Sequence, residues 1–405
     1  MKLISFVGTS DYKDATYFFQ GQEYTSRYFP VVAVHAFQPD ELLLVVTEEA
    51  YLKHFEAIAD EVHLQTVLTP VRIPAGKTEP ELWDIFDILT DSIDVGDEVI
   101  FDITLSFRSI PILAVIAAAF WRTAKQVTLR NLIYGAFEAK DEQGRSPIFD
   151  LTPMLSLMDW TVATDKFLKT GNAAELGGLL KEAQSLPYRN ADASARQNLP
   201  RHLQDAAGAL DSVSKSMRLM RPHDLMSEAR KLNRSLSLIR QEVDTWAKPF
   251  AGLLDQTQQE YRKFIVDSPR EQLNKNLGVQ MALIEWYVQK DQIVQAITLA
   301  REWLVSLVIL RLNLMLIEDR DYVELLLNVG ANSLQKEKNP LPPPLRKLEG
   351  ADHLVREWNW LRDLRNDVAH CGMRKQPRSL NSILSDAQSI VERLRPLLDT
   401  AQDAN

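Results

Sequence analysis

The spacing of apolar residues along the sequence changes once, near residue 152, and this change limits the folds that the chain can adopt. Residues 1–152 alternate short apolar runs, such as 3–7 and 99–103, with stretches of helical periodicity. Strands that alternate with helices predict a mainly parallel sheet covered by helices. From Pro153 onward, apolar residues recur at three- and four-residue spacing, which is typical of packed helices. We therefore expect an α/β domain over 1–152 and an all-α region over 153–405.

The pattern also predicts individual elements. We expect a hairpin of two strands, 15–20 and 23–29, after the first strand, and a weak strand at 71–73. In the helical region the pattern predicts a long apolar helix over 293–317. A proline-rich connector is expected over 332–344 and a helix over 354–371, which Gly372 would terminate.

Composition narrows the class of protein. The 405 residues are 45% hydrophobic and 25% charged, as in soluble globular proteins of two or three domains. No apolar run approaches the roughly 20 residues of a membrane helix, and the N-terminus lacks the basic region of a signal peptide. The single Cys371 excludes an intrachain disulfide and a cysteine-rich metal site. We expect a cytoplasmic protein without a membrane segment, and no cluster of Asp, Glu and His predicts a metal site.

Net charge bears on the partners. A formal charge of -9 argues against a protein that coats nucleic acid non-specifically, because such binding needs a broad cationic face. Residues 345–378 are nevertheless locally basic, with eight Lys and Arg against five acids. This excess supports an anionic substrate at that segment. The eight basic residues are Arg346, Lys347, Arg356, Arg362, Arg365, Arg374, Lys375 and Arg378.

Polar residues follow two of the predicted inner strands, and in open sheets ligands bind at these strand ends. Glycine lets the backbone approach a ligand closely, and hydroxyls and N–H groups bind phosphate. The arginine guanidinium can donate two parallel hydrogen bonds to a phosphate. Turn and N-cap chemistry selects the same residue types and is the alternative explanation. The occurrence of two such loops favours a ligand that carries phosphate, and the missing G-x-G-x-x-G pattern argues against a nicotinamide enzyme. The candidates are Gly8, Thr9, Ser10, Asp11, Thr104, Phe107, Arg108 and Ser109.

A second candidate site lies at 360–372, where Arg365 and His370 are separated by four residues. Arginine is permanently charged, and histidine is the side chain whose ordinary pKa lies nearest neutrality. Together they suit the cleavage of a phosphodiester, although this spacing also occurs by chance. Asn366 and Asp367 would either orient the pair or only stabilise the helix.

Helix geometry places a condition on this pair. Five residues of ideal helix turn about 500°, so the two side chains leave the helix about 140° apart. Either the helix loosens before Gly372 or a second subunit completes the site. For Trp358 and Trp360, core packing is favoured over stacking on RNA bases, and Arg301 with Glu302 is expected at a solvated helix edge.

Four segments together resemble a known family. Three of them are similar to the CARF domain of CRISPR-associated ribonucleases of type III systems, and the fourth looks like the R-x4-H motif of their HEPN domain. The segments read Ile4-Ser5-Phe6-Val7-Gly8-Thr9, Asp102-Ile103-Thr104-x-x-Phe107-Arg108-Ser109-x-Pro111, Tyr134-Gly135-Ala136-Phe137-Glu138 and Arg365-Asn366-Asp367-Val368-Ala369-His370.

The resemblance implies a Rossmann-like CARF sensor followed by a HEPN ribonuclease. Such proteins bind cyclic oligoadenylate and then cleave single-stranded RNA without metal or cofactor, as homodimers or larger even-numbered oligomers. Carried over by position, Arg365 and His370 are catalytic, with Asn366 and Asp367 beside them, and the strand-end residues contact the ring. A ring on a two-fold axis must contain four or six adenylates, and the family favours cyclic tetraadenylate.

One departure leaves questions open. Many relatives have His-Gly where this chain has Leu105-Ser106. The ring size, and whether the CARF domain degrades its activator, therefore stay undecided. Two other functions remain as alternatives: a non-catalytic CARF sensor that signals to a partner protein through its helical domain, and a HEPN ribonuclease controlled by another nucleotide. A transcription factor fits least, because the second half shows no compact basic helix-turn-helix.

Overall fold

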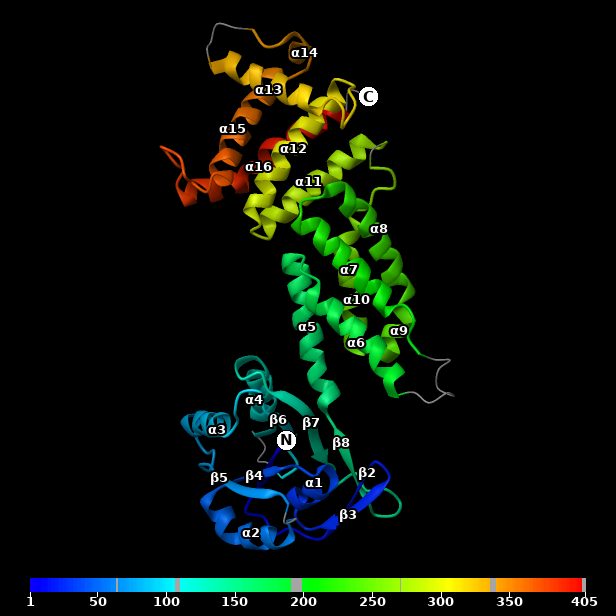
Figure 1. Cartoon of the computed structure of the whole chain (residues 1–405), viewed down its shortest axis with the longest axis vertical. Coiled ribbons are helices and arrows are strands. Elements are labelled where there is room, and N and C mark those ends of the chain that lie inside the picture. The colour runs from blue at the N-terminus through cyan, green and yellow to red at the C-terminus, as the bar shows by residue number, and fades with distance from the viewer. Residues whose placement is uncertain (63–64, 106–109, 191–198, 270, 336–339, 403–405) are drawn as a thin grey trace. The chain divides into compact units, whose positions relative to one another are not determined.

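The computed structural model describes residues 1–62, 65–105, 110–190, 199–269, 271–335 and 340–402 (Figure 1). The chain forms two compact units, Met1–Asp159 and Trp160–Asn405. Helix α5 (Thr152–Thr170) begins at the expected end of the first domain and contributes residues to both units.

The first unit is built on an eight-stranded sheet among the described residues. Strand β1 lies between β4 and β6 and pairs in parallel with both, so the sheet is built outward on both sides of β1. This mainly parallel α/β sheet confirms the expected fold class. The strand order is β3-β2-β8-β7-β6-β1-β4-β5, and the bounds are β1 (Lys2–Val7), β2 (Ala15–Phe19), β3 (Gln22–Ser26), β4 (Glu41–Val46), β5 (Val67–Arg72), β6 (Glu98–Asp102), β7 (Thr128–Gly135) and β8 (Ser146–Asp150).

Both faces of the central strands are buried. Along β1, Leu3 and Val7 enter one hydrophobic core, whereas Ile4 and Phe6 enter the other on the opposite face. Because neither face meets water, the strand is a continuous apolar run rather than an alternating one. The helices that pack on the sheet are α1 (Phe29–Phe37), α2 (Glu48–Glu61), α3 (Glu79–Asp91) and α4 (Ile110–Ala124).

Two strand predictions in this unit need correction. The second hairpin strand ends at Ser26 instead of residue 29, because Phe29–Phe37 forms α1. Pro30 lies in the first turn of α1, where its missing N–H costs no helical hydrogen bond. The expected weak strand at 71–73 is the six-residue β5, which contains Pro70. β5 is an edge strand paired only with β4, a position that tolerates proline.

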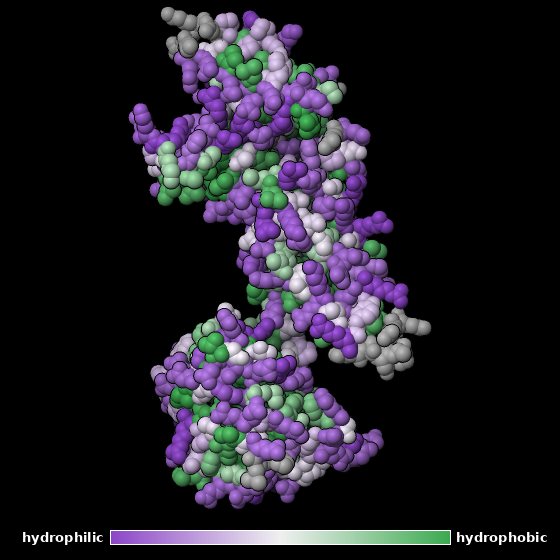
Figure 2. All heavy atoms as spheres, in the orientation of Figure 1, coloured by the Kyte–Doolittle hydropathy of each residue, from purple (hydrophilic) through white to green (hydrophobic). Residues whose placement is uncertain are grey.

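The second unit is helical, as expected, and shares one large hydrophobic core. Its central helix, α12, is long and apolar enough to cross a membrane, but 67% of its apolar window is buried inside the unit, as in the core helix of a soluble protein. The bounds are α6 (Ala174–Asn190), α7 (Leu203–Arg218), α8 (Pro222–Leu238), α9 (Arg240–Trp246), α10 (Lys248–Arg262), α11 (Leu273–Gln289), α12 (Ile293–Arg311), α13 (Arg320–Gln335), α14 (Pro343–Arg346), α15 (Ala351–Ala369) and α16 (Leu380–Gln402). Hydrophilic side chains cover much of the visible surface, with smaller hydrophobic patches between them (Figure 2).

Helix boundaries differ from the expected ones around α12 and α13. The apolar helix expected to reach residue 317 ends at Arg311, where Asn313 takes a left-handed backbone conformation at φ 53°. The connector expected to begin at residue 332 begins later, because α13 continues to Gln335.

Arg301 is not at a solvated edge, which corrects the expectation for this residue. Its side chain is 10% exposed and donates to Glu302 Oε1 at 2.5 Å and to Glu324 of α13. Glu302 also accepts from Arg320 at 2.7 Å, so one carboxylate holds two guanidinium groups. The Arg301 guanidinium lies 4.7 Å from the ring centroid of Trp358 on α15, and that tryptophan is fully buried, in agreement with core packing.

Candidate functional sites

The two predicted ligand loops begin at adjacent strands. Gly8 follows β1 and Ile103 follows β6, and because these strands pair in parallel the two loops open at the same sheet edge. A Cβ placed on Gly8 would lie 4.0 Å from the Leu105 carbonyl oxygen, so the loops approach closely. From β1 the sheet continues to β4 on one side and β6 on the other, which makes this sheet edge a topological switch point. Of the residues expected to contact a ligand, Phe107, Arg108 and Ser109 lie outside the described residues, as does Ser106.

Helix α2 holds the loop that follows β1. Lys53 Nζ donates to the Thr9 carbonyl at 2.7 Å, and His54 Nε2 lies 3.0 Å from the Ser10 carbonyl oxygen. Lys53 also pairs with Asp11 at 2.7 Å, and this hydrogen bond lowers the pKa of the Asp11 carboxyl. The sequence patterns did not reveal this role for Lys53 and His54, because α2 lies more than forty residues away in the chain.

The end of β6 contains a buried acid. Asp102 is 0% exposed, and it accepts from the Ser5 hydroxyl and from the Thr104 N–H at 2.8 Å. Burial raises the pKa of Asp102 to about 6, against the lowering effect of these hydrogen bonds. The Thr104 hydroxyl oxygen accepts from the Gly135 N–H at 2.7 Å. Thr104 therefore links the ends of β6 and β7, in addition to the ligand contact expected of it.

The predicted Arg-His motif lies at the C-terminal end of α15. Arg365 is half-buried and donates to Asn366 Oδ1 at 3.2 Å. Within the described part of the chain, no carboxylate pairs with Arg365 and no group bonds to the exposed His370 ring. Asn366 contacts Arg365, which fits an orienting role.

Three backbone hydrogen bonds define the end of α15. His370 N–H donates to Asn366 O at 3.1 Å, which keeps the helical phase through His370. Cys371 N–H then donates to Val368 O and Gly372 N–H to Asp367 O, both at 3.0 Å, which is the Schellman motif. The helix ends at Ala369, earlier than expected, and the first left-handed residue is Cys371 at φ 53°, followed by Gly372 at φ 69°.

This regular helix end answers the geometric question about the pair. The helix does not loosen before His370, so the Arg365 and His370 side chains leave the axis about 140° apart. The helix ends at Ala369, before Gly372, but His370 is still in helical phase, so the divergence that the sequence predicts for one chain is present.

Asp367 faces the loop that follows α15. It is 1% exposed, and its Oδ1 accepts from Arg374 Nη1 and from the Arg378 N–H, each at 3.4 Å, while Oδ2 has no partner among the described residues. One turn earlier, Asp363 binds Arg374 at 3.0 Å and Arg378 at 2.8 Å. Arg378 also pairs with Asp386 of α16. Asp367 therefore acts on the loop, while Asn366 is the residue that contacts Arg365.

These ion pairs reduce the positive charge that residues 345–378 can offer to a substrate. Arg374 and Arg378 contribute to the basic excess of residues 345–378, but acids on α15 and α16 neutralise both. Burial raises the pKa of Asp363, and the hydrogen bonds from Arg378 and Arg374 outweigh this effect and lower it. The charge left for a substrate comes instead from exposed residues such as Lys375 and from Arg365.

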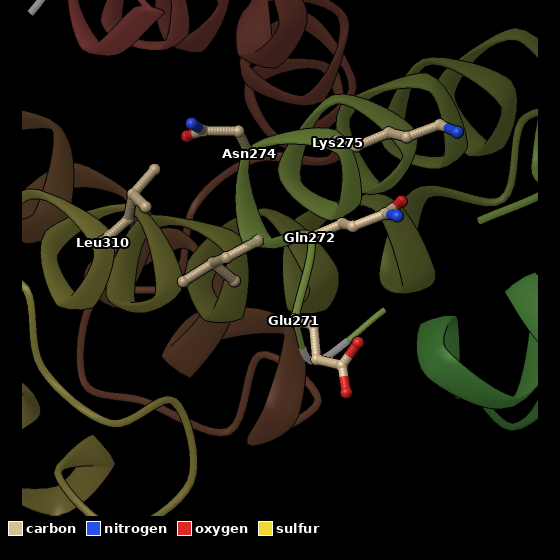
Figure 3. Close-up of a pocket in the computed structure, with 6 residues that line it drawn as sticks. Glu271, Gln272, Asn274, Lys275 and Leu310 are labelled. Carbon is tan, nitrogen blue, oxygen red and sulfur yellow. The ribbon is translucent and has the colours of Figure 1, made fainter. Parts of the chain in front are cut away.

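A surface pocket lies elsewhere in the helical unit. It is formed at the N-terminal end of α11 by Gln272, Asn274, Lys275 and their neighbours, with Leu310 of α12 opposite (Figure 3). It contains none of the residues that the sequence identified. The residues that the structure describes include no group of three or more His, Cys, Asp or Glu side chains that could hold a metal ion.

Comparison with known proteins gives two sequence matches. Residues 156–272 match the family model described as CRISPR-associated protein MJ1674, second domain. Over 112 residues the chain is 34% identical to CRISPR-associated protein MJ1674 of Methanocaldococcus jannaschii, a region that covers 27% of this chain and 18% of that protein. Residues 156–272 are thus similar to one domain of a CRISPR-associated protein. This similarity agrees, over residues 156–272, with the CRISPR-associated class that the sequence predicts.

The match has a limited extent. The aligned region spans less than a fifth of the curated relative, and residues 156–272 contain neither the strand-end loops nor α15. Among solved structures, Enterococcus italicus Csm6 bound to cyclic hexa-2'-fluoro-hexa-dAMP aligns over 99% of this chain and 94% of its own, at 12% identity and a TM-score of 0.48. A likeness of that size does not by itself establish a common fold.

Proposed function

We propose that this CRISPR-associated protein is an endoribonuclease that cyclic oligoadenylate activates and that cleaves single-stranded RNA without metal. It would act in the cytoplasm, in type III CRISPR antiviral defence. The observation that carries the proposal is the Arg365–His370 pair at the C-terminal end of one helix. Among the described residues no carboxylate pairs with the Arg365 guanidinium, and no group bonds to the His370 imidazole.

The pair supplies the two functions that RNA cleavage needs. The ribose 2′-hydroxyl loses its proton and its oxygen attacks the adjacent phosphorus, while the bond from phosphorus to the 5′-oxygen breaks. The products are a 2′,3′-cyclic phosphate and a 5′-hydroxyl, whose oxygen takes up a proton. His370 takes part in these proton transfers, which typically contribute about 10²–10⁴-fold. Arg365 stabilises the additional negative charge on the phosphorane-like transition state. Asn366 orients the Arg365 fork through the 3.2 Å hydrogen bond, and Asp367 holds the loop that follows His370.

A second copy of the chain completes this site. The two side chains diverge by about 140° on a regular helix, so one motif cannot surround a phosphate, whereas two motifs related by a two-fold axis can. The first unit offers an apolar surface that supports self-association. Ile112, Ile116 and Phe120 lie four residues apart on α4 and are 68%, 55% and 44% exposed.

The activator binds at the sheet edge where the β1 and β6 loops open. Thr9 and Ser10 offer hydroxyls there, beside the Gly8 backbone, and this edge lies at the switch point of the sheet. In a two-fold dimer the ring must itself contain a two-fold, so it has four or six adenylates. Cyclic tetraadenylate is the ring proposed, and Phe107, Arg108 and Ser109 are proposed to contact it from the second loop.

The test is an RNA cleavage assay in EDTA with cyclic tetraadenylate or cyclic hexaadenylate. The wild-type chain is expected to cleave a single-stranded RNA when one ring is present, and His370→Ala and Arg365→Ala are expected to lose at least about 100-fold. Arg356→Ala is the matched control, because Arg356 is an exposed arginine on the same helix. Cleavage that requires a divalent metal, or that neither ring stimulates, would contradict the proposal. Ring binding without cleavage would instead identify a non-catalytic sensor.

A further inference from the structure

Tyr12 follows β1, and its phenol oxygen lies next to Gly8 at the end of that strand. Its Oη accepts a hydrogen bond from the Gly8 N–H at 2.8 Å. A Cβ on Gly8 would lie 3.4 Å from that oxygen and 4.0 Å from the Leu105 carbonyl oxygen. The phenol oxygen therefore lies where the end of β1 approaches the end of β6, at the switch point of the sheet.

The surroundings of the Tyr12 ring hold it in place. The ring packs 5.9 Å from the Tyr28 ring, edge to face, and 5.2 Å from the His54 ring. Because the Ser10 carbonyl can only accept, the His54 nitrogen 3.0 Å from it, Nε2, carries the proton. Nδ1 then accepts from the Tyr28 hydroxyl at 3.1 Å. His54 is thus neutral with a fixed tautomer, in agreement with its pKa, which burial lowers.

One hydrogen-bonding group of Tyr12 is left for a ligand. Its oxygen accepts from Gly8, but no group in the described part of the chain accepts the phenolic proton. Burial raises the pKa of Tyr12, so the proton stays on the phenol near neutral pH. A hydroxyl that accepts one hydrogen bond becomes a stronger donor through polarisation. Its best acceptor is an anionic oxygen, because charge-assisted hydrogen bonds are the strong ones.

We propose that Tyr12 binds the activator by donating its phenolic hydrogen bond to a phosphate oxygen of the ring. This inference rests on the proposed function, since it concerns the same sheet edge. It also revises the role expected of Gly8. The Gly8 N–H acts through Tyr12 rather than on the phosphate itself.

The experiment measures calorimetric binding of cyclic tetraadenylate to the full chain and to two variants. Tyr12→Phe removes only the donor, and its affinity is expected to fall about 10-fold or more, the usual effect of losing a hydrogen bond to a charged group. Tyr28→Phe is the matched control, because it removes a hydroxyl from the same aromatic cluster whose partner is His54. Its affinity is expected to stay within about three-fold of wild type.

The outcomes separate the inference from the proposed function. If the wild type binds the ring and Tyr12→Phe binds it equally well, Tyr12 is not a ligand residue. Equal losses in both variants would mean that the cluster only shapes the loop, and would also overturn the inference. Failure of the wild-type chain to bind cyclic tetraadenylate and cyclic hexaadenylate would refute the proposed function itself. Melting temperatures of both variants close to wild type would show that the loss in Tyr12→Phe is local.

Discussion

Arg378 Nη2 lies 2.8 Å from Asp363 Oδ2, although the two residues are fifteen positions apart in the chain. The same guanidinium pairs with Asp386, and the Arg378 N–H donates to Asp367. One side chain therefore connects α15, the loop after it and α16. Because His370 lies where that loop leaves α15, the position of the imidazole depends on these bonds.

Loss of this connection should reduce RNA cleavage without unfolding the protein. In Arg378→Ala the loop loses its side-chain bonds to Asp386 of α16 and to Asp363, and Arg374 remains as its side-chain link to α15. We expect the turnover rate at saturating activator to fall about 10-fold, the scale of a misplaced catalytic group. Arg378→Lys keeps the positive charge but cannot form two directed bonds with a planar guanidinium, so its turnover rate should lie between those of the wild type and Arg378→Ala. Arg356→Ala, at an exposed arginine of α15, is the control for lost charge. Activator affinity is measured in parallel and should not change. A wild-type turnover rate in Arg378→Ala would contradict the role of this residue.

The shared carboxylate of Glu302 should contribute to stability. Burial raises the pKa of Glu302, and the hydrogen bond from Arg320 and the charge of Arg301 outweigh this effect and lower it. The Arg301 guanidinium is buried, and its Nε has no hydrogen-bond partner among the described residues. Glu302→Gln would remove one of the carboxylates that pair with this guanidinium. Because Glu302 is 39% exposed, we discount the penalty for solvent screening and expect a loss of about 2 kcal/mol in the free energy of unfolding.

Urea denaturation of the full chain measures this loss. Glu285→Gln is the control, because Glu285 pairs with Arg395 at the surface, where both side chains are well exposed. Equal stabilities for the two variants would show that the Arg301–Glu302–Arg320 network contributes no more than a surface ion pair.

Asp102 predicts a particular dependence of stability on pH. Its pKa is raised from 3.8 to about 6, so the folded state binds the proton more tightly than the unfolded state. Its contribution is therefore complete below about pH 4 and is lost as the pH rises through 6. The loss is on the order of 2–3 kcal/mol. Asp102→Asn cannot lose a proton, so its stability relative to wild type should rise between pH 4 and pH 7.

Unfolding curves at several pH values test this sign. The exposed Asp87→Asn variant serves as the control and should follow the wild-type curve. A relative stability of Asp102→Asn that falls as the pH increases would mean that the buried group is a stabilised carboxylate instead.

The apolar face of α4 should be required for the dimer that we propose. Ile116→Asp places a charge in the middle of the exposed Ile112–Ile116–Phe120 row, and sedimentation should show more monomer at equal concentration. Because Ile116 is exposed in one chain, the fold should not change. Leu52→Asp, at a 77% exposed leucine on α2, is the control. An unchanged dimer fraction in Ile116→Asp would place the interface elsewhere.

Local patterns were sufficient for much of the fold. The inner strands β1, β4 and β6 and the helical second half follow from runs and spacings that each lie within one segment. Helix α1 was missed, because Tyr28, Phe29 and Val31 have side chains that suit a strand equally well, and Pro30 alone marks the helix start. Arg301 was misplaced because its acids, Glu302 and Glu324, become partners only when α12 packs on α13.

In the candidate sites, too, some features follow from one short segment of sequence, whereas others arise only when distant segments pack together. The Arg365–His370 spacing can be recognised within six residues of sequence, but its regular helix end depends on backbone hydrogen bonds that no residue type specifies. Asp363 and Arg378 form a pair only because the chain reverses after Gly372. Tyr12 carries no motif at all, and its interest arises when β1 pairs with β6 and the two loops meet.

The turn that ends α15 also gives the protein a built-in reporter. Cys371 is the chain's single cysteine, it is exposed, and it follows His370 directly. A thiol-reactive fluorophore or spin label would therefore attach at one position, one residue from the imidazole, without any substitution. Two such labels in a dimer would report the separation of the two motifs, with and without the cyclic nucleotide.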